Sequence, residues 1–192
     1  VKTQEQSLQY AGEPLPQGEP ARVTIAIRDD AGNESLPCTV TVYNARVDWK
    51  AGWIGDADAK PGQTVYLRRD FHVGQGLTSA VLYICGIGCQ KPYLDGEPLD
   101  AAALDPAHTD WTRQCQYVTY PGLESRLKPG AHCLGAMLGT GWRHNALLGH
   151  EGVAPDGVHY RFGGPVQLTA MLRLTYAGGD TRWIMTDDTW QA

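Results

Sequence analysis

The sequence lacks several features that would place it in large functional classes. It has no cluster of Lys or Arg, and its 16 basic residues are outnumbered by 21 acidic ones, giving a formal net charge of -5. Without a basic patch there is no electrostatic footprint for a nucleic-acid backbone or an anionic membrane surface. The chain also has no apolar run of about 18 or more residues, which a membrane-spanning helix requires. Neither nucleic acid nor a membrane is therefore an expected partner.

Helical patterning is also missing. No long segment places apolar residues at the i, i+3, i+4, i+7 spacing of an amphipathic helix. Instead, 23 Gly and 12 Pro punctuate a chain that is 42% hydrophobic and 19% charged. That composition is typical of a folded globular protein rather than a disordered one. The sequence therefore predicts an ordered, all-β protein.

Cysteine usage favours free thiols. The chain has 5 cysteines, an odd number, and all but Cys89 lie among apolar or strand-like neighbours. Cys85 and Cys89 have a Cys-x3-Cys spacing, but no second pair with zinc-site spacing follows. His108 and His132 are isolated in the sequence. We therefore expect buried free thiols rather than a zinc site.

Alternation with a period of two is the dominant signal. Val23, Ile25 and Ile27 share one face of a predicted strand. Further runs rich in β-branched or aromatic residues and bounded by Gly, Pro and Asp also predict strands. They lie at residues 39–43, 64–71, 80–85, 116–120, 133–138, 166–176 and 183–186. In the run 166–176, every second residue is apolar and is expected to face the same way.

Two turn signals predict antiparallel hairpins. One is Asp95-Gly96, and the other is Gly178-Gly179, which joins the strand at 166–176 to that at 183–186. Several short strands need two facing sheets to bury their apolar faces, so an antiparallel β-sandwich or jelly roll is expected. Residues 139–164 are then predicted to form a surface loop. A domain boundary is expected near residues 44–48, because the first 44 residues are too few for a complete sandwich.

Short motifs run through nearly the whole chain in a fixed order, which is hard to obtain by chance. In chain order they are residues 10–12 (YAG), 30–35 (DAGNES), 48–54 (DWKAGWI), 66–71 (YLRRDF), 82–88 (LYICGIG), 93–97 (YLDGE), 104–106 (LDP), 109–111 (TDW), 117–120 (YVTY), 138–142 (LGTGW) and 186–190 (TDDTW).

Together these motifs resemble glycoside hydrolase family 78, the bacterial α-L-rhamnosidases, whose N-terminal regions carry a fibronectin-like domain followed by a jelly-roll domain. The resemblance implies that residues 1–44 are the C-terminal part of a fibronectin type III-like, immunoglobulin-like domain. It implies that residues 45–192 form a jelly-roll β-sandwich of the galactose-binding-like kind. The chain departs from the family pattern at Asp95, Arg143 and Cys89, where Asn, an aromatic residue and Tyr are more usual.

The resemblance also implies what the chain should not do alone. Enzymes of this family resemble inverting glycosidases, in which a carboxylic acid protonates the leaving oxygen and a carboxylate activates water. Those groups belong to an (α/α)6-barrel domain, and the present chain ends before any such helical pattern begins. We expect a non-catalytic fragment whose partner is that catalytic domain of the same protein. Glu151, Asp187 and Asp188 are interpreted as exposed turn acids.

Carbohydrate binding is the alternative function. An aromatic side chain stacks on sugar C–H faces while Arg and Asn donate hydrogen bonds. The candidate contacts with a rhamnoside are Trp142, Arg143, His144, Asn145, Asp110 and Trp111. The competing interpretation is that Trp142 anchors the base of a loop, with Arg143 and His144 solvated.

No cofactor is expected, although some family jelly rolls resemble modules that bind rhamnose through calcium. Calcium needs several oxygen ligands, and Asp105, Asp110, Asp156 and Asn145 are the candidates. Their spacing is irregular, so the metal site stays unassigned. The N-terminus has no signal-peptide layout, which leaves a cytoplasmic, periplasmic or secreted location open. The remaining aromatic residues are expected to serve packing at strand ends and the core rim: Trp49, Trp53, Trp183, Trp190, Tyr83, Tyr117 and Tyr120.

Overall fold

A computed structural model describes residues 12, 20–43, 47–60, 62–102, 104–107, 109–111, 113–143, 151–153, 159–161 and 164–192, with backbone alone for Pro20, Tyr43, Trp142, 151–153 and 159–161. The chain divides into two compact units, Val1–Asp48 and Trp49–Ala192. Regular structure in the described residues consists of β-strands and two short 3-10 turns. The all-β prediction is confirmed. No helix among these residues is long and apolar enough to cross a membrane.

The first unit contains one antiparallel pair, β1 (Pro20–Ile25) and β2 (Cys38–Tyr43). Val23 lies opposite Val40 and Ile25 opposite Cys38, so one face of the pair is apolar. The other face carries Thr24 and Thr39, whose hydroxyl oxygens are 2.9 Å apart and share a hydrogen bond. Ile25, on the apolar face, is 56% exposed.

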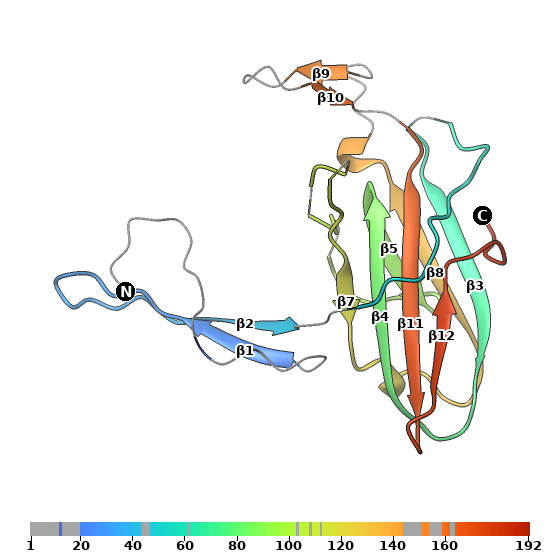
Figure 1. Ribbon diagram of the computed structural model, residues 1–192, viewed down its shortest axis with the longest axis horizontal. Coiled ribbons are helices and arrows are strands. Elements are labelled where there is room, and N and C mark those ends of the chain that lie inside the picture. Colours follow the sequence, from blue (N-terminus) through green and yellow to red (C-terminus); the bar gives the residue numbers. More distant parts are fainter. Residues whose placement is uncertain are drawn as a thin grey trace. The chain divides into compact units, whose positions relative to one another are not determined.

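The second unit contains two four-stranded antiparallel sheets, with strand orders β12-β11-β4-β7 and β3-β8-β5-β6, and the separate pair β9-β10 (Figure 1). The elements are β3 (Val65–Val73), β4 (Leu77–Ile87), β5 (Cys89–Leu94), β6 (Glu97–Pro98), β7 (Val118–Tyr120), η1 (Leu123–Ser125), β8 (Gly130–Gly139), η2 (Gly141–Arg143), β9 (Glu151–Val153), β10 (His159–Arg161), β11 (Gln167–Tyr176) and β12 (Thr181–Met185).

Both predicted hairpins are present. Tyr93 pairs with Pro98 and Leu94 with Glu97, which leaves Asp95 and Gly96 as a two-residue turn. Their φ values of 53° and 85° are the left-handed values that a type I′ turn requires. The second hairpin joins β11 to β12 through a turn that contains Gly178 and Gly179.

The segment 139–164, predicted to be a surface loop, contains short regular elements. Within it, β9 and β10 pair antiparallel, with Tyr160 opposite Gly152, and η2 occupies residues 141–143.

One glycine position allows the chain to pass from one sheet to the other. Gly88 lies between β4 and β5 and has a φ of 117°. A Cβ atom at this position would overlap the carbonyl oxygen of Gly139. Any larger residue would therefore combine backbone strain with a clash against a neighbouring main chain.

The hydrophobic core lies between the two sheets. From β11, Leu168, Ala170, Leu172 and Leu174 point inward, as the alternation in 166–176 predicts, and meet inward residues of the facing sheet such as Leu134. In β4 and β11, most residues between the inward positions are also buried, although Arg173 is only partly so. The sheet that contains these strands is therefore covered on both faces.

Candidate functional site

The outer face of the β12-β11-β4-β7 sheet carries a row of four aromatic rings, called here the ring row. Trp49 and Tyr117 have ring centroids 5.5 Å apart, Tyr117 and Tyr83 are separated by 6.2 Å, and Tyr83 and Trp183 by 6.4 Å. These separations lie in the range of favourable tilted and edge-to-face ring contacts. Tyr83 comes from β4 and Trp183 from β12, so the row crosses the sheet.

The segment that carries Trp49 is fixed to this face by hydrogen bonds. The Trp49 indole Nε1 donates to Thr169 Oγ1 at 2.8 Å, and the Thr186 hydroxyl donates to the Gly52 carbonyl at 2.6 Å. Thr169 and Thr186 are both buried. Because buried hydroxyl groups need partners, these bonds determine where residues 49–52 cross the sheet.

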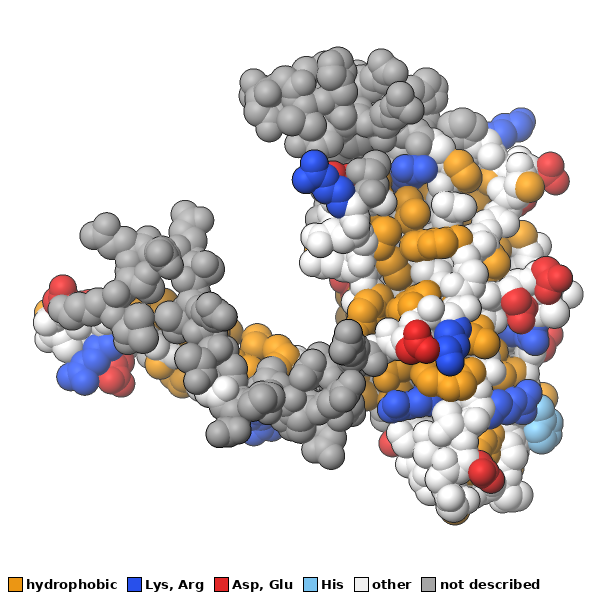
Figure 2. All heavy atoms as spheres, viewed as in Figure 1, with side chains coloured by type: hydrophobic (Ala, Val, Ile, Leu, Met, Phe, Trp, Pro, Cys, Tyr) orange, Lys and Arg blue, Asp and Glu red, His pale blue; other side chains and the backbone are white. Residues whose placement is uncertain are grey.

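The ring row is only partly covered. Trp183 is 38% exposed, Tyr117 is 39% exposed, and the nearby segment adds Trp53 at 43%. Figure 2 shows hydrophobic side chains at the surface over β4, β11 and β12, interrupted by charged groups. Arg173 lies opposite Trp183 in the strand register. Its buried Nε finds no acceptor among the residues that the structure describes.

The predicted sugar contacts are only partly brought together. The guanidinium carbon of Arg143 lies 5.7 Å from the centre of the Trp111 ring, a cation–π arrangement. Arg143 Nε is buried without an acceptor in the described part of the chain. Asp110 forms an ion pair with Arg113 at 3.4 Å.

Other predicted contacts cannot be placed. Trp142 belongs to η2, and only its backbone is described. His144 and Asn145 lie outside the described residues, as does Asp156 among the calcium candidates. Among the described residues, no three His, Cys, Asp or Glu side chains come together as a metal site. Asp105 instead pairs with β5 through its carbonyl, which accepts the Gln90 N–H at 2.6 Å.

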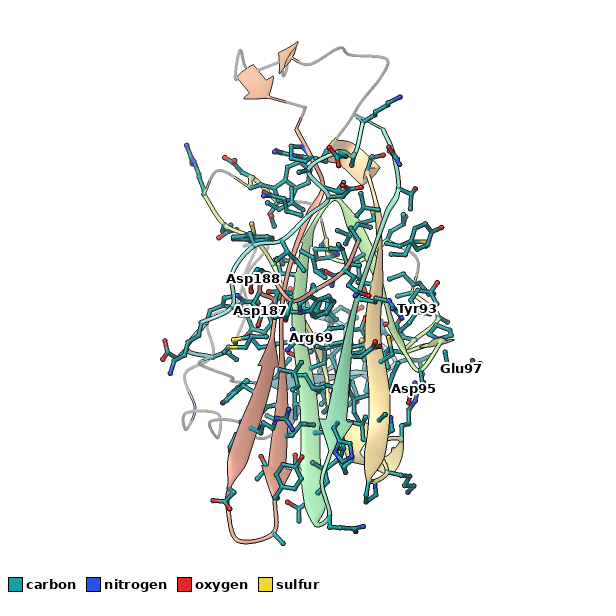
Figure 3. All side chains as sticks on the ribbon, turned by 90° about the vertical axis from the view of Figure 1, so that its right-hand side faces the viewer. Arg69, Tyr93, Asp95, Glu97, Asp187 and Asp188 are labelled. Carbon is teal, nitrogen blue, oxygen red and sulfur yellow. The ribbon has the colours of Figure 1, made fainter. Side chains whose placement is uncertain are left out.

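Asp187, one of the candidate acids, has a structural role. Its Oδ1 accepts hydrogen bonds from the Thr189 hydroxyl and N–H, and lies 3.1 Å from Arg69 Nη1. The Thr189 hydroxyl, its N–H and the Arg69 charge outweigh partial burial and lower the pKa of Asp187. Figure 3 shows Arg69 beside Asp187 and Asp188. An ionised carboxylate that caps a turn and joins two sheet edges is poorly suited to donate a proton.

A second carboxylate held by hydrogen bonds lies at the β5–β6 turn. Asp95 Oδ1 accepts the Cys133 N–H at 2.8 Å, and Asp95 Oδ2 lies 2.7 Å from His132 Nδ1. The other ring nitrogen of His132 is 2.6 Å from the Lys128 carbonyl oxygen. Both nitrogens thus face acceptors, and only the doubly protonated imidazolium can donate to both.

This arrangement shifts both groups toward their charged forms. Partial burial disfavours the charge on His132, but the hydrogen bonds to Asp95 and Lys128 outweigh it and raise the His132 pKa. Partial burial likewise opposes ionisation of Asp95, yet the Cys133 N–H, His132 and Arg126 lower its pKa overall. Sequence inspection missed this pair because the two residues are far apart in the chain and meet only when β5 pairs with β8.

Comparison with known proteins identifies the family. The sequence profile described as Alpha-L-rhamnosidase N-terminal domain matches residues 75–192. An alpha-L-rhamnosidase of Alteromonas sp. (strain LOR) is 31% identical over 156 residues, which is 76% of this chain and 16% of that protein. One from Streptomyces avermitilis is 30% identical over 145 residues, covering 75% of this chain and 13% of the relative. The chain thus spans less than a fifth of the length of these relatives.

Solved structures show the same fold. The alpha-L-rhamnosidase of Dictyoglumus thermophilum superposes with a TM-score of 0.67 at 20% identity, over 98% of this chain and 22% of the other. The native enzyme from Aspergillus terreus gives a TM-score of 0.64 at 23% identity, over 93% of this chain and 21% of the other. The profile match covers more than half of the sequence. This chain therefore belongs to the family of alpha-L-rhamnosidase N-terminal domains.

Proposed function

We propose that this chain is a non-catalytic accessory module of an α-L-rhamnosidase, an inverting hydrolase that releases terminal L-rhamnose. In this role the sandwich docks on the catalytic domain of the same protein. The observation that carries the proposal is the ring row, because aromatic side chains are enriched at interaction sites and those of Trp183 and Tyr117 are left partly exposed here.

The acids are consistent with a module that does no chemistry. A glycosidase needs a carboxylic acid that is still protonated near neutral pH, hence one with a raised pKa. Asp95 and Asp187 both have lowered pKa values and serve as structural acceptors. We expect no turnover of an aryl α-L-rhamnoside by this chain. Turnover that Glu151→Gln abolishes would contradict the proposal.

Docking through the ring row is tested by measuring one substitution in two contexts. Trp183→Ala should lower the urea midpoint only slightly in this chain, because the ring is already partly exposed. It should lower the midpoint clearly more in a longer protein that includes the catalytic domain, where the ring is buried. Tyr66→Ala is the matched control, since Tyr66 is 67% exposed on β3 of the other sheet. Equal effects of Trp183→Ala in both contexts would contradict docking at this face.

We further propose that residues 1–44 are the closing part of a fibronectin type III-like domain. The support is the apolar face of the β1–β2 pair, since an isolated two-stranded pair is marginally stable in water and normally packs against a second layer. Amide hydrogen exchange of this chain should then be much faster in β1 and β2 than in β4. Equal protection of these strands would contradict the assignment.

A second candidate function is rhamnoside binding at Trp111 and Arg143. The observation in its favour is the guanidinium of Arg143 over the Trp111 ring, because an aromatic face beside a planar donor group is an arrangement that a sugar ring can contact. A solved structure of the Streptomyces avermitilis alpha-L-rhamnosidase is described as complexed with L-rhamnose, and it matches 68% of this chain at 26% identity with a TM-score of 0.55. Titration with L-rhamnose, with and without calcium, tests the idea. Absence of binding at millimolar sugar in both titrations would exclude it.

A further inference from the structure

The last residues of the chain pair with the edge of the second sheet. β3 is the first strand in the order β3-β8-β5-β6, so one of its two edges faces away from its partner β8. On that edge, Gln191 forms an isolated antiparallel bridge with Arg68. Figure 1 shows the C-terminal end of the chain beside β3. The C-terminal segment therefore makes the first contact of an additional strand in this sheet.

The bridge has the full geometry of a strand pair. The Arg68 N–H donates to the Gln191 carbonyl at 2.9 Å, and the Gln191 N–H donates to the Arg68 carbonyl at 3.0 Å. The two side chains lie on the same face, because the Arg68 guanidinium donates to Gln191 Oε1 through Nε at 3.1 Å and through Nη2 at 2.8 Å. Two residues that exchange both main-chain bonds form the hydrogen-bonded pair of an antiparallel ladder. Such a pair determines the register of the residues that follow.

The residues before Gln191 fix its position. Asp187 Oδ1 lies 3.1 Å from Arg69 Nη1 of β3. The indole Nε1 of Trp190 donates to the Met185 carbonyl at 3.0 Å, and its ring packs against the core. The chain therefore reaches β3 at one defined register.

The same edge of β3 is occupied at its other end and open at its beginning. In an antiparallel ladder, every second residue turns its N–H and C=O away from the partner strand. Two residues to one side of Arg68 and beyond, the His72 carbonyl accepts Arg182 Nη1 at 3.0 Å. Two residues to the other side lies Tyr66, whose main chain makes no hydrogen bond with any described residue outside the ladder with β8. Native proteins usually cover or protect such an edge.

We propose that, if this chain is a module of an α-L-rhamnosidase as proposed above, the segment that follows Ala192 continues the pairing as an added antiparallel strand on β3. Gln191 lies opposite Arg68, so this register places the first residue after Ala192 opposite Tyr66. The Tyr66 N–H donates to the carbonyl of that residue, and the Tyr66 carbonyl accepts its N–H. The β3 edge thus binds an extended segment of the same protein through main-chain bonds, as in other cases of strand addition.

The added strand directs the chain out of the module along β3, toward Val65. A connection whose first residues are held in a sheet is stiffer than a flexible linker. Strand addition would therefore restrict the orientation of the module relative to the domain that follows. Side chains stand roughly perpendicular to the sheet, so a strand added in its plane bonds the Tyr66 main chain and leaves the exposed ring on the outer face.

The test measures amide hydrogen exchange at single-residue resolution in three proteins. They are this chain, the longer protein that includes the catalytic domain, and this chain extended by about ten further residues of the same protein, the length of a long strand. The Tyr66 N–H should exchange rapidly in this chain and about tenfold more slowly in the other two, because a bonded amide exchanges only when the strand opens. The Arg68 N–H, bonded to Gln191 in all three, is the internal control.

Two proline variants of the extended chain test the register. Gln191→Pro removes the N–H that donates to Arg68 and should return the exchange of Tyr66 to the rate seen in this chain. Asp188→Pro is the matched control, because residue 188 is the second residue of a turn closed by the Trp190 N–H and the Asp187 carbonyl. Proline is favoured at that position of a turn. This variant should leave Tyr66 protected.

Three results would overturn the proposal. The first is equally rapid exchange of Tyr66 in this chain and in the longer protein. The second is protection in the longer protein but not in the extended chain, because the covering group would then belong to another domain. The third is protection that survives in a folded Gln191→Pro protein. Docking through the ring row is followed separately at Trp183, so either proposal can fail without the other.

Discussion

The two faces of the β12-β11-β4-β7 sheet are both buried over much of their area, but they are built differently. The inner face is aliphatic, with residues such as Leu82 and Leu172 that make non-directional contacts with the facing sheet. The outer face carries Tyr83, Cys85 and Thr169, covered by two segments that are held by ring contacts and hydroxyl hydrogen bonds. The inner face supplies stability, and the outer face supplies specific positions on which an interaction surface can be built.

The largest expected effect comes from the inner face. Leu172→Ala removes a side chain that is 0% exposed and surrounded by the core. Loss of its transfer free energy and the resulting cavity should lower the free energy of unfolding by about 3 kcal/mol. Urea denaturation followed by circular dichroism measures the change. Leu104→Ala, at a 76% exposed position, is the control and should change stability little.

A smaller effect is expected when one bond on the outer face is removed. Thr169→Val keeps the shape of the buried side chain but leaves the Trp49 indole N–H without its acceptor. An unsatisfied buried donor costs about 1–3 kcal/mol, and the partial exposure of Trp49 favours the lower end. Denaturation and the near-ultraviolet signal of the tryptophans report the change. Thr181→Val on exposed β12 is the matched control, and an equal loss there would contradict the assigned role of Thr169.

The smallest effect is expected from the Asp95–His132 pair, which lies on the other sheet. Because folding raises the His132 pKa, its stabilisation is fully present below the ordinary value of 6.5 and is lost as the pH rises through the raised value. Because folding lowers the Asp95 pKa, its contribution is present above 3.8 and is lost as the pH falls through the lowered value. The Asp95 side chain is 45% exposed, and solvent screening of this carboxylate keeps the contribution of the pair to about 1 kcal/mol or less.

The urea midpoint of the wild-type protein should therefore fall as the pH is raised from mildly acidic to mildly alkaline values, because His132 loses its proton. Asp95→Asn should flatten this decline, because a neutral amide no longer favours the imidazolium. His72→Gln, altered at an exposed histidine of β3, should leave the pH profile unchanged. A profile that Asp95→Asn leaves unaltered would show that His132 is protonated for another reason.

Local signals in the sequence predicted the parts of the fold that local chemistry determines. The Asp95-Gly96 dipeptide indicates its turn because both residues tolerate positive φ, and the alternation in 166–176 indicates the inward face of β11. The register between β5 and β8 has no comparable local signal. The sequence therefore does not indicate the partnership of His132 with Asp95.

In the candidate site, too, residue types can be read from the sequence, whereas contacts between distant segments cannot. Trp111 and Arg143 could be named from residue type, but their ring-to-guanidinium contact depends on where η2 and the segment before β7 end in space. The five cysteines, predicted to be buried free thiols, form no disulfide, but only Cys85 is buried and Cys38 is exposed.

The most direct test of the outer face as an interaction surface is hydroxyl-radical footprinting of two proteins, this chain and a longer one that includes the catalytic domain. Trp183 and Tyr117 should be oxidised readily in this chain and protected several-fold in the longer protein. Tyr66, exposed on the opposite sheet, should react equally in both. Equal oxidation of Trp183 and Tyr117 in the two proteins would contradict docking through the ring row.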